Sequence, residues 1–425
     1  MIDLITGIER VKNAALEAHA PPPGVRPDAR GAWNGDAEAL AAALRGRIAG
    51  EVRFDDGSRA LYATDASNYR QVPIGVVVPR TIEDAIETVA VARAFGAPVL
   101  ARGGGTSLAG QCCNVAVVLD FSKYVNRVLE VNVHERWARV EPGIVLDDLR
   151  AQVARFGLWF GPDPATHTHN TLGGMIGNNS CGMHAQFAGK TEANTLELDV
   201  LTYDGVRLTV GATPDDELQR LCGREDRTGE IYRGLRALRD EYADLIRARF
   251  PHIPRRVSGF GLDQLLPENG FNVARALVGT ECTCVLVLNA KVKLIPNPAK
   301  RCILVAGFKD IYEAGDRVPD VNAHQPIALE GLDDKLIGMM RVKHLEEGDL
   351  ALLPDGEGWL MCEFGSVDDK DEAIARATAC KTDLESKGAV GTKLILDEAD
   401  QRRLWAIREA GLGATAKVPH HAPTH

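Results

Sequence analysis

The chain has 425 residues and a formal net charge of −10, with 59 acidic against 49 basic side chains. Hydrophobic residues make up 45% of it and charged residues 25%, which is typical of a globular protein with two or three domains and not of a disordered or fibrous chain. The acidic balance argues against a nucleic-acid partner, because phosphate backbones require a basic surface.

The first 35 residues contain a Pro-Pro-Pro-Gly run between Ala-rich stretches, which indicates a flexible arm. We expect folded structure to begin near Asp36. Residues 75–78 predict a short buried strand, and Thr81 is placed to open a helix whose apolar face includes Ile82 and Val89. A β-α-β unit is therefore expected between residues 75 and 119.

The main motif is a glycine-rich stretch over residues 101–111, between apolar runs that predict two strands joined by a tight turn. Consecutive glycines allow positive φ and let amide groups approach an anion, so a diphosphate is a suitable ligand. The spacing excludes two familiar phosphate loops, since no Lys follows Gly110 and Leu108 occupies the third glycine position of a dinucleotide fingerprint. Taken alone, an ordinary turn remains the alternative.

A second polar, glycine-rich region covers residues 161–182. It follows paired strands expected at 128–133 and 137–140 and a short helix that Gly157 ends. So long a polar segment inside a compact domain is costly unless it binds something. We interpret it as a binding surface.

The remaining pattern divides the chain into two units. A hairpin at 196–210, a helical insertion at about 213–272 and strands up to residue 296 complete a first domain over residues 36–298. From 299 to 425 the strands and helices restart in an order that suggests part of a ferredoxin-like domain. The expected fold class is α+β.

Cysteine usage and hydropathy bear on the compartment. The nine cysteines include no Cys-x-x-Cys pair and indicate reduced thiols, without a disulfide frame or a metal site. No basic-then-apolar start and no run of about 18 apolar residues predicts export or membrane spanning. The cytoplasm is the expected location.

Four motifs in order resemble the FAD-linked oxidases that share the fold of vanillyl-alcohol oxidase and p-cresol methylhydroxylase. The matching segments are 79–81, 102–107, 163–182 and 279–283. Within that family the chain resembles the D-lactate, glycolate and D-2-hydroxyglutarate dehydrogenases, above all the amino-terminal part of long bacterial members fused to an iron-sulfur domain. The resemblance implies a two-subdomain FAD-binding domain followed by an incomplete substrate (cap) domain.

The resemblance also implies site residues and chemistry. The first loop would hold the FAD pyrophosphate, the second would follow the ribityl chain and the isoalloxazine ring, and Glu281 would fix the adenosine end or the nearby loop. Thr106 stands where relatives with covalent flavin often have His, so bound FAD is expected to be non-covalent. The implied cofactor-binding residues are Arg102, Gly103, Gly104, Gly105, Thr106, Ser107, Gly110, Asp163, Thr171, Gly173, Gly174, Asn178, Asn179, Gly182 and Glu281.

The expected reaction is hydride transfer from the α-carbon of a D-2-hydroxy acid to flavin N5, followed by electron transfer to an acceptor. Arg408 lies in a segment that matches the family's substrate arginine, and a guanidinium suits a carboxylate. A surface ion pair is the alternative for Arg408, and it is the favoured interpretation for Lys417. His167 and His169 are candidate bases, with loop capping ranked higher.

Three departures from the family pattern matter. Cys282 replaces a usual glycine, the His-x-His-x-Gly-Asp-Gly metal segment is absent, and no Cys cluster for an iron-sulfur centre occurs. We therefore expect any divalent metal or iron-sulfur cluster only in a missing carboxy-terminal part. A truncated, catalytically incomplete FAD-binding fragment is the alternative function, and a homo-oligomer is compatible with the sequence.

Overall fold

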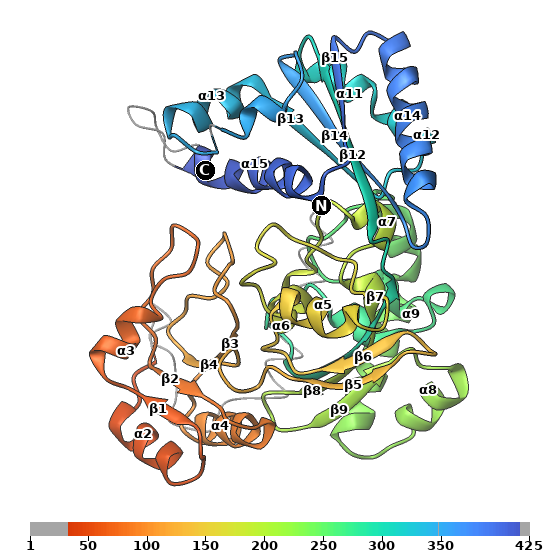
Figure 1. Cartoon of the computed structure of the whole chain (residues 1–425). Coiled ribbons are helices and arrows are strands. Elements are labelled where there is room, and N and C mark those ends of the chain that lie inside the picture. The colour runs from red at the N-terminus through yellow and green to blue at the C-terminus, as the bar shows by residue number, and fades with distance from the viewer. Residues whose placement is uncertain (1–32, 347, 417–425) are drawn as a thin grey trace.

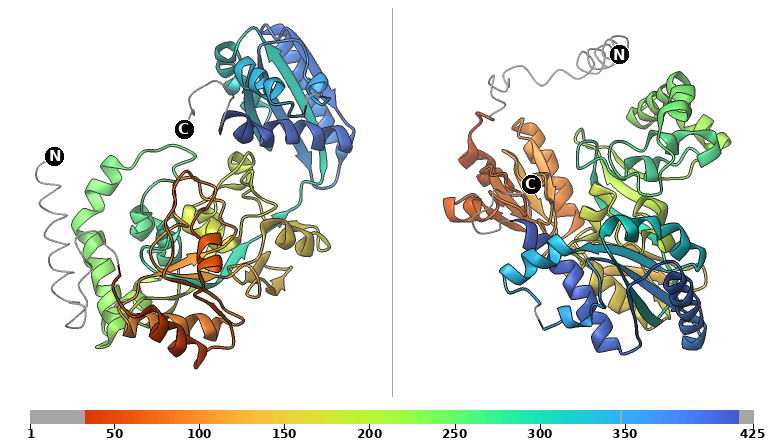
Figure 2. Two further views of the ribbon diagram at one scale, coloured as in Figure 1. Left: turned by 90° about the vertical axis from the view of Figure 1, so that its left-hand side faces the viewer. Right: turned by 90° about the horizontal axis from the view of Figure 1, so that it is seen from above.

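A computed structural model describes residues 33–346 and 348–416, so most of the expected arm at 1–35 lies outside the described residues. The chain forms a lower part with two sheets and, above it, a carboxy-terminal part built on a third large sheet (Figure 1). Two further views show the same separation, with the blue carboxy-terminal part placed on one side of the rest (Figure 2).

The first sheet has the strand order β1-β2-β4-β3. Its strands are β1 (Glu51–Arg53), β2 (Gly75–Val78), β3 (Val99–Arg102) and β4 (Val117–Asp120), and its helices are α2 (Ala37–Arg45), α3 (Asp56–Leu61) and α4 (Ile82–Ala94). Asp36 and Thr81 accept backbone N–H groups and cap α2 and α4 as the sequence predicts.

The expected tight turn between β3 and β4 is wrong. The two strands are parallel and adjacent, so residues 103–116 must cross back over the length of the strands. β4 lies between β2 and β3, and the expected β-α-β unit is therefore split by the strand that follows it. The glycine-rich stretch is therefore a long connection that starts at the end of β3, and it is long enough to line one side of a binding site.

The second sheet has the order β5-β6-β10-β8-β9 and is antiparallel throughout. Its strands are β5 (Val128–Asn132), β6 (Trp137–Val140), β8 (Thr195–Leu201), β9 (Arg207–Gly211) and β10 (Leu286–Lys293). The helices of this part are α5 (Leu146–Ala154), α6 (Leu172–Asn178), α7 (Ala185–Ala188), α8 (Asp215–Cys222), α9 (Arg227–Arg249) and α10 (Val273–Leu277), with 3-10 turns η1 (Glu192–Asn194), η2 (Leu262–Leu265) and η3 (Pro267–Asn269). A small ribbon pairs β7 (Leu158–Trp159) with β11 (Ile295–Pro296).

Two sequence expectations change in this part. The polar region 161–182 is not a continuous loop, because α6 occupies its centre, where Leu172, Met175 and Ile176 turn into the core. The strands expected up to residue 296 begin at Leu286 and are preceded by a short helix that was not expected there, α10.

The third sheet has the order β13-β14-β12-β15 with all neighbours antiparallel. It comprises β12 (Lys300–Phe308), β13 (Ala328–Asp333), β14 (Gly358–Ser366) and β15 (Gly391–Ile395). The central pair runs from Lys300 opposite Ser366 to Phe308 opposite Gly358. The chain order βαββαβ with this strand order is ferredoxin-like, so the third sheet has the expected fold.

Helices cover both faces of this sheet. On one face α11 (Ile311–Asp316), α12 (Val318–Ala323) and α14 (Lys370–Ser386) pack on Leu304, Cys362 and Phe364. On the other face α13 (Asp334–Val342), η4 (Leu350–Leu352) and α15 (Glu398–Ala416) pack on Val305 and Met361. The second face is turned toward the lower part of the molecule, so α15 lies between the third sheet and the lower part (Figure 1).

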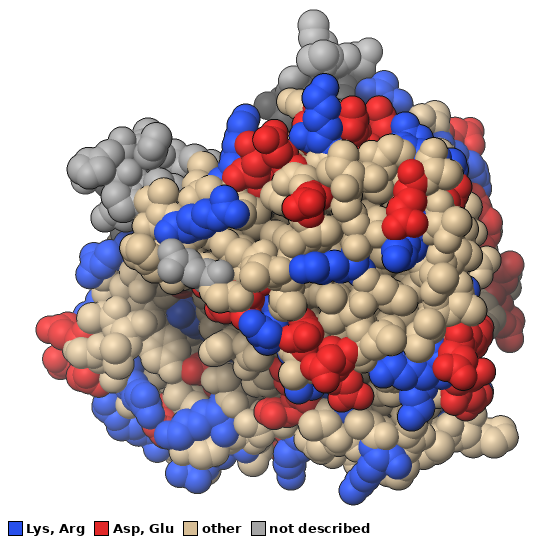
Figure 3. All heavy atoms as spheres, turned by 45° about the horizontal axis from the view of Figure 1, so that its top comes forward, with Lys and Arg blue, Asp and Glu red and all other residues tan. Residues whose placement is uncertain are grey.

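On the face shown in Figure 3, Lys and Arg side chains alternate with Asp and Glu side chains. Neither sign forms a continuous field there. The absence of a nucleic-acid partner stays a prediction.

Candidate functional site

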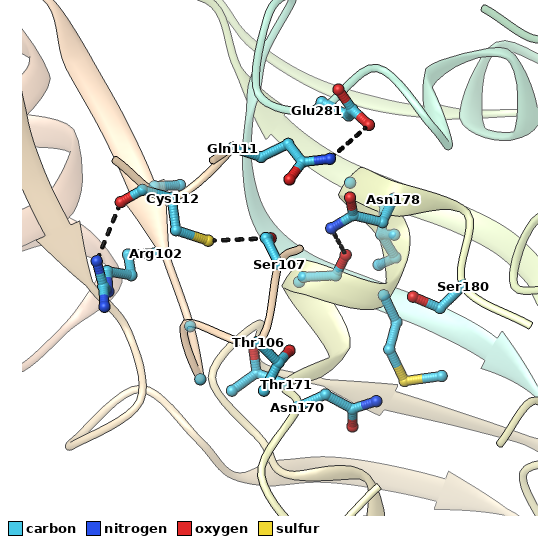
Figure 4. A pocket seen from close by; sticks show the side chains of 18 of the residues that line it. Arg102, Thr106, Ser107, Gln111, Cys112, Asn170, Thr171, Asn178, Ser180 and Glu281 are labelled. Carbon is cyan, nitrogen blue, oxygen red and sulfur yellow. Dashed lines mark hydrogen bonds between the residues drawn. The ribbon is translucent and has the colours of Figure 1, made fainter. Parts of the chain in front are cut away.

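A cavity of about 540 Å³ lies in the lower part of the molecule, where α15 of the carboxy-terminal part approaches it. Three segments of the lower part line it, residues 101–112, 164–180 and 277–287, and Arg408 of α15 reaches it from the carboxy-terminal part. Its volume is typical of small-molecule and cofactor sites, which measure roughly 300–1,000 Å³. Figure 4 shows the polar side chains of these segments converging on one space.

The glycine triplet forms one wall, in close contact with the second polar region. A Cβ on Gly103 would lie 1.9 Å from the Thr171 hydroxyl oxygen, and a Cβ on Gly104 would lie 2.1 Å from the His169 carbonyl oxygen. Gly105 has a φ of +67°, which disfavours other residues. Gly103 and Gly104 are therefore required by the segment packed against them, and Gly105 is required by its backbone conformation.

Arg102 shapes this wall from behind. Its guanidinium donates hydrogen bonds to the carbonyl oxygens of Tyr62, Thr64 and Cys112 at 3.3, 2.8 and 3.0 Å. These three bonds tie the start of the 103–116 connection to Cys112 within it and to the segment 62–64 that follows α3.

Hydrogen bonds between and within the segments fix the other walls. The Gln111 amide donates to the Glu281 carboxylate at 3.3 Å, and Ser107 Oγ lies 3.2 Å from Cys112 Sγ. Asn178 donates to the Gly174 carbonyl oxygen at 3.1 Å within α6. These contacts are drawn as dashed lines in Figure 4.

Asn170 is a site residue that the sequence analysis missed. It lines the cavity and is only 4% exposed, yet neither its amide nitrogen nor its amide oxygen has a hydrogen-bond partner. Leaving a buried polar group unpaired costs about 1–3 kcal/mol. An Asn in a polar segment gives no signal for this role in sequence, because its lack of partners exists only in the fold.

Four of the implied cofactor residues do not line the cavity: Gly110, Asp163, Asn179 and Gly182. Asp163 is buried and bonded to His184, and a Cβ on Gly182 would lie 1.9 Å from the Asp163 carbonyl oxygen. Asn179 ends α6 in the left-handed conformation and accepts the Glu192 N–H. These residues shape the wall from outside, as does Gly110, which has a φ of +82°. Lys417 lies outside the described residues.

The other implied residues all line the cavity: Arg102, Gly103, Gly104, Gly105, Thr106, Ser107, Thr171, Gly173, Gly174, Asn178 and Glu281. Glu281 and Cys282 both have positive φ, +50° and +61°. Cys282 lines the cavity and is exposed there, and desolvation by the neighbouring protein raises the pKa of its thiol to about 11. Cys282 thus occupies a glycine-like conformation as a neutral thiol.

Arg408 reaches the cavity from α15 and forms an ion pair there. Its Nε lies 3.4 Å from Glu330 Oε2 of β13, while Glu330 Oε1 is buried without a partner. Since the Arg408 side chain remains 29% exposed, its outer donors are free to meet a carboxylate in the cavity. Neither His167 nor His169 lines the cavity, although both come from the segment that does.

Comparison with known proteins gives two family matches. Residues 73–211 match the model described as FAD binding domain, and residues 297–424 match the model described as FAD linked oxidases, C-terminal domain. The chain belongs to the FAD-linked oxidase family. The match over 73–211 includes the glycine triplet and the Asn170 segment, so two of the three segments that line the cavity belong to the matched FAD binding domain.

Curated relatives extend beyond this chain. It is 33% identical over 315 residues to D-2-hydroxyglutarate dehydrogenase of Pseudomonas putida (strain KT2440), an alignment that covers 72% of this chain and 31% of the relative. It is 27% identical over 391 residues to glycolate oxidase subunit GlcD of Escherichia coli (strain K12), covering 90% of this chain and 66% of that protein. The chain thus spans about a third of the length of the first relative.

Solved structures confirm the expected fold class. An alkyldihydroxyacetonephosphate synthase superposes with a TM-score of 0.61 at 16% identity, covering 87% of this chain and 68% of that one. Physcomitrella patens BBE-like 1 superposes with a TM-score of 0.55 at 15% identity, covering 84% and 61%. These likenesses support the α+β FAD-binding fold and no more.

Over residues 33–346 and 348–416, no helix is both long and apolar enough to cross a membrane. Within the same ranges, no group of three or more His, Cys, Asp or Glu side chains is arranged to hold a metal ion.

Proposed function

We propose that the holoprotein oxidises a D-2-hydroxy acid, such as D-2-hydroxyglutarate, D-lactate or glycolate, with FAD as hydride acceptor. The observation that carries the proposal is the placement of Arg408. The guanidinium of Arg408, carried by α15 of the carboxy-terminal part, lines the cavity of the lower part, where an anionic substrate would meet the cofactor. Relatives named as D-2-hydroxyglutarate dehydrogenase and glycolate oxidase subunit support the same substrate class.

The cavity walls would bind FAD without a covalent bond. The 103–107 backbone and the Thr106 and Ser107 hydroxyls would bind the pyrophosphate, since a Cβ-free wall lets a diphosphate approach amide donors. Thr171, Gly173, Gly174 and Asn178 would follow the rest of the cofactor along α6. The unpaired Asn170 amide offers one donor group and one acceptor, which suits the carbonyl and N–H groups along the edge of an isoalloxazine ring.

The bound flavin would supply the hydride acceptor and would pass the electrons to a separate acceptor. Arg408 would bind the substrate carboxylate through a bidentate pair and so orient the α-carbon toward the cofactor. Glu330 would hold the Arg408 side chain through Nε, which leaves the outer guanidinium donors for the substrate. The ferredoxin-like part would close the cavity against water.

The proposal includes the organisation of the chain. We assign residues 36–298 to the FAD-binding domain and 299–425 to the cap, and we place the protein in the cytoplasm. A divalent metal or an iron-sulfur cluster would belong to a further part of the kind that the longer relatives contain beyond their aligned regions.

An anaerobic spectral titration tests the proposal. The purified chain should carry flavin, and its visible absorption should bleach on addition of the D enantiomer of 2-hydroxyglutarate or lactate, or of glycolate. L-2-hydroxyglutarate and L-lactate are the matched controls. Flavin that no 2-hydroxy acid bleaches would reject the catalytic proposal for this chain and leave the FAD-binding fragment.

A further inference from the structure

Two histidines near the cavity have the same unusual environment. His167 lies between Asp147 of α5 and Glu409 of α15, with its Nδ1 2.7 Å from Asp147 Oδ2 and its Nε2 3.2 Å from Glu409 Oε1. One carboxylate belongs to the lower part of the molecule and the other to the cap. The imidazole therefore bridges the two parts.

His184 repeats this arrangement in the buried interior. Its Nδ1 contacts Asp163 of the lower part, and its Nε2 lies 3.4 Å from Glu363 Oε1 of β14 in the cap. The side chains of His184 and Glu363 are 4% and 1% exposed. The imidazole and the Trp159 ring also pack edge to face, with centroids 5.0 Å apart.

Each of these two histidine–carboxylate bridges is connected to α15, the helix that carries Arg408. Glu409 is the next residue along α15, and Trp405, one turn earlier, donates its indole N–H to Glu363 Oε2 at 2.8 Å. The bridges thus hold α15 on both sides of the residue that enters the cavity. Neither histidine itself lines the cavity.

Protonation decides whether each bridge is complete. A neutral imidazole has one N–H donor and one acceptor, so it can donate to only one of two carboxylates, whereas the cation donates to both. Around His184 the charged neighbours are Asp163 and Arg150 from the lower part and Glu363 and Arg301 from β14 and β12 of the cap.

Around His167 the carboxylates of Asp147 and Glu409 face the ring, while Arg408 on the same turn of α15 is engaged by Glu330. No cation in these contacts faces the His167 ring directly. The His167 bridge therefore places two carboxylates, and no cation among these contacts, around one imidazole.

We propose that His167 and His184 are positioning residues, which as imidazolium bridges hold α15, and with it Arg408, over the FAD cavity. The part of this proposal that concerns how the bridges hold α15 in place does not depend on the proposed substrate. The effect on substrate binding rests on the proposed function.

The pH range follows from His167, the more accessible of the two. Its hydrogen bond to Glu409 outweighs the desolvation that opposes it, and with Asp147 raises the pKa to about 9. Because the folded pKa lies above the unfolded one, the bridge contributes its full stabilisation of the folded state below the ordinary imidazole pKa of about 6.5. It is lost as pH rises through about 9. For His184 burial lowers the pKa, but Asp163 and Glu363 outweigh burial, so the net shift is also upward.

Hydrogen exchange of the FAD-loaded chain without substrate tests the holding step. After correction for intrinsic exchange, α15 amides should lose protection between pH 8 and 10 in the wild type. In His167→Gln they should exchange about tenfold faster at pH 7 and show no such transition. Glu409→Gln should behave in the same way.

His169→Gln is the matched control. His169 comes from the same segment, but its ring contacts only the neighbouring Thr168 hydroxyl in the described structure, at 2.6 Å. This variant should keep the wild-type exchange profile. Exchange of α15 that is identical in wild type and His167→Gln across the pH range would overturn the proposal, whatever the protein's activity.

Steady-state kinetics separates positioning from a general structural role. His167→Gln should raise KM for the 2-hydroxy acid about tenfold with little change in kcat, and its KM should no longer rise above pH 8. An equal fall of kcat in the His167 and His169 variants, with KM unchanged in both, would also refute a positioning role. If His184→Gln does not fold, the His167 and Glu409 variants still decide the question.

Discussion

Replacing Asn170 by Leu should have opposite effects on the two forms of the protein. Leu is close to Asn in shape and removes two buried polar atoms that have no partner in the fold. Each unpaired group costs about 1–3 kcal/mol, so the variant apoprotein should gain stability even if part of the cost is relieved by local adjustment. A net gain of about 1 kcal/mol would raise Tm by about 2–4 °C.

The holoprotein should lose cofactor affinity through the same change. If the Asn170 amide makes two hydrogen bonds to FAD, each with a net value of about 0.5–1.5 kcal/mol, the loss is about 1–3 kcal/mol. This corresponds to a rise in the FAD Kd of about 5- to 150-fold. The backbone of Asn170 would be unaffected, since its N–H bonds to the Thr166 carbonyl oxygen and its own carbonyl accepts the Leu146 N–H.

The assay combines thermal unfolding of the apoprotein with FAD titration followed by quenching of flavin fluorescence. Asn126→Leu is a suitable control, because that side chain bonds the Ser122 carbonyl oxygen and lies outside the cavity lining. An unchanged Kd for FAD together with a lower apoprotein Tm would refute the reasoning. It would show that the Asn170 amide has a structural partner and does not face the cofactor.

Gly104→Ala should abolish FAD retention, because its Cβ would lie 2.1 Å from the His169 carbonyl oxygen and one of the two segments must move; absorbance after gel filtration measures this. Gly234→Ala, in open space on α9, should instead stabilise the chain by about 0.5–1 kcal/mol, and equal flavin loss in both variants would contradict the prediction. Arg408→Met should raise KM for the 2-hydroxy acid about 100-fold while the flavin spectrum stays unchanged, and an unaltered KM would remove Arg408 from the site. Burial raises the pKa of Glu363, but Arg301 and His184 outweigh it and lower the pKa to about 2. Its stabilisation is therefore present above its ordinary pKa and lost as pH falls toward about 2. Glu363→Gln should lower Tm at pH 7, and the difference in Tm between variant and wild type should become smaller as the pH falls. A Tm difference that does not change with pH would contradict this.

Local features of the fold were predictable from the sequence because they depend on neighbouring residues. Asp36 and Thr81 mark helix starts through their own side chains. The hairpin between β8 and β9 follows from the turn preference of Asp204-Gly205, and its strands are found as expected. The βαββαβ order of the cap was visible in part, although α13 was missed.

The candidate site was predictable to the extent that it depends on backbone freedom. Gly103 and Gly104 stand out in the sequence, and the structure explains them by the atoms that a Cβ would meet. Arg408 was recognised only through its resemblance to a family segment. Its arrival at the cavity depends on the packing of α15 against the cap sheet, more than 300 residues after the first loop.

Tertiary structure alone decided the strand order, the buried amide and the histidine bridges. Sequence cannot show that β4 inserts between β2 and β3, because pairing of parallel strands is set by contacts across the sheet. Nor can it show that Asn170 has no partner or that His167 and His184 each have two carboxylates from different parts of the chain. The sequence by itself determined where the chain can turn and which residue types it offers. The roles of these residues depend on desolvation and charge pairing, which arise only when segments distant in the sequence pack together and exclude water.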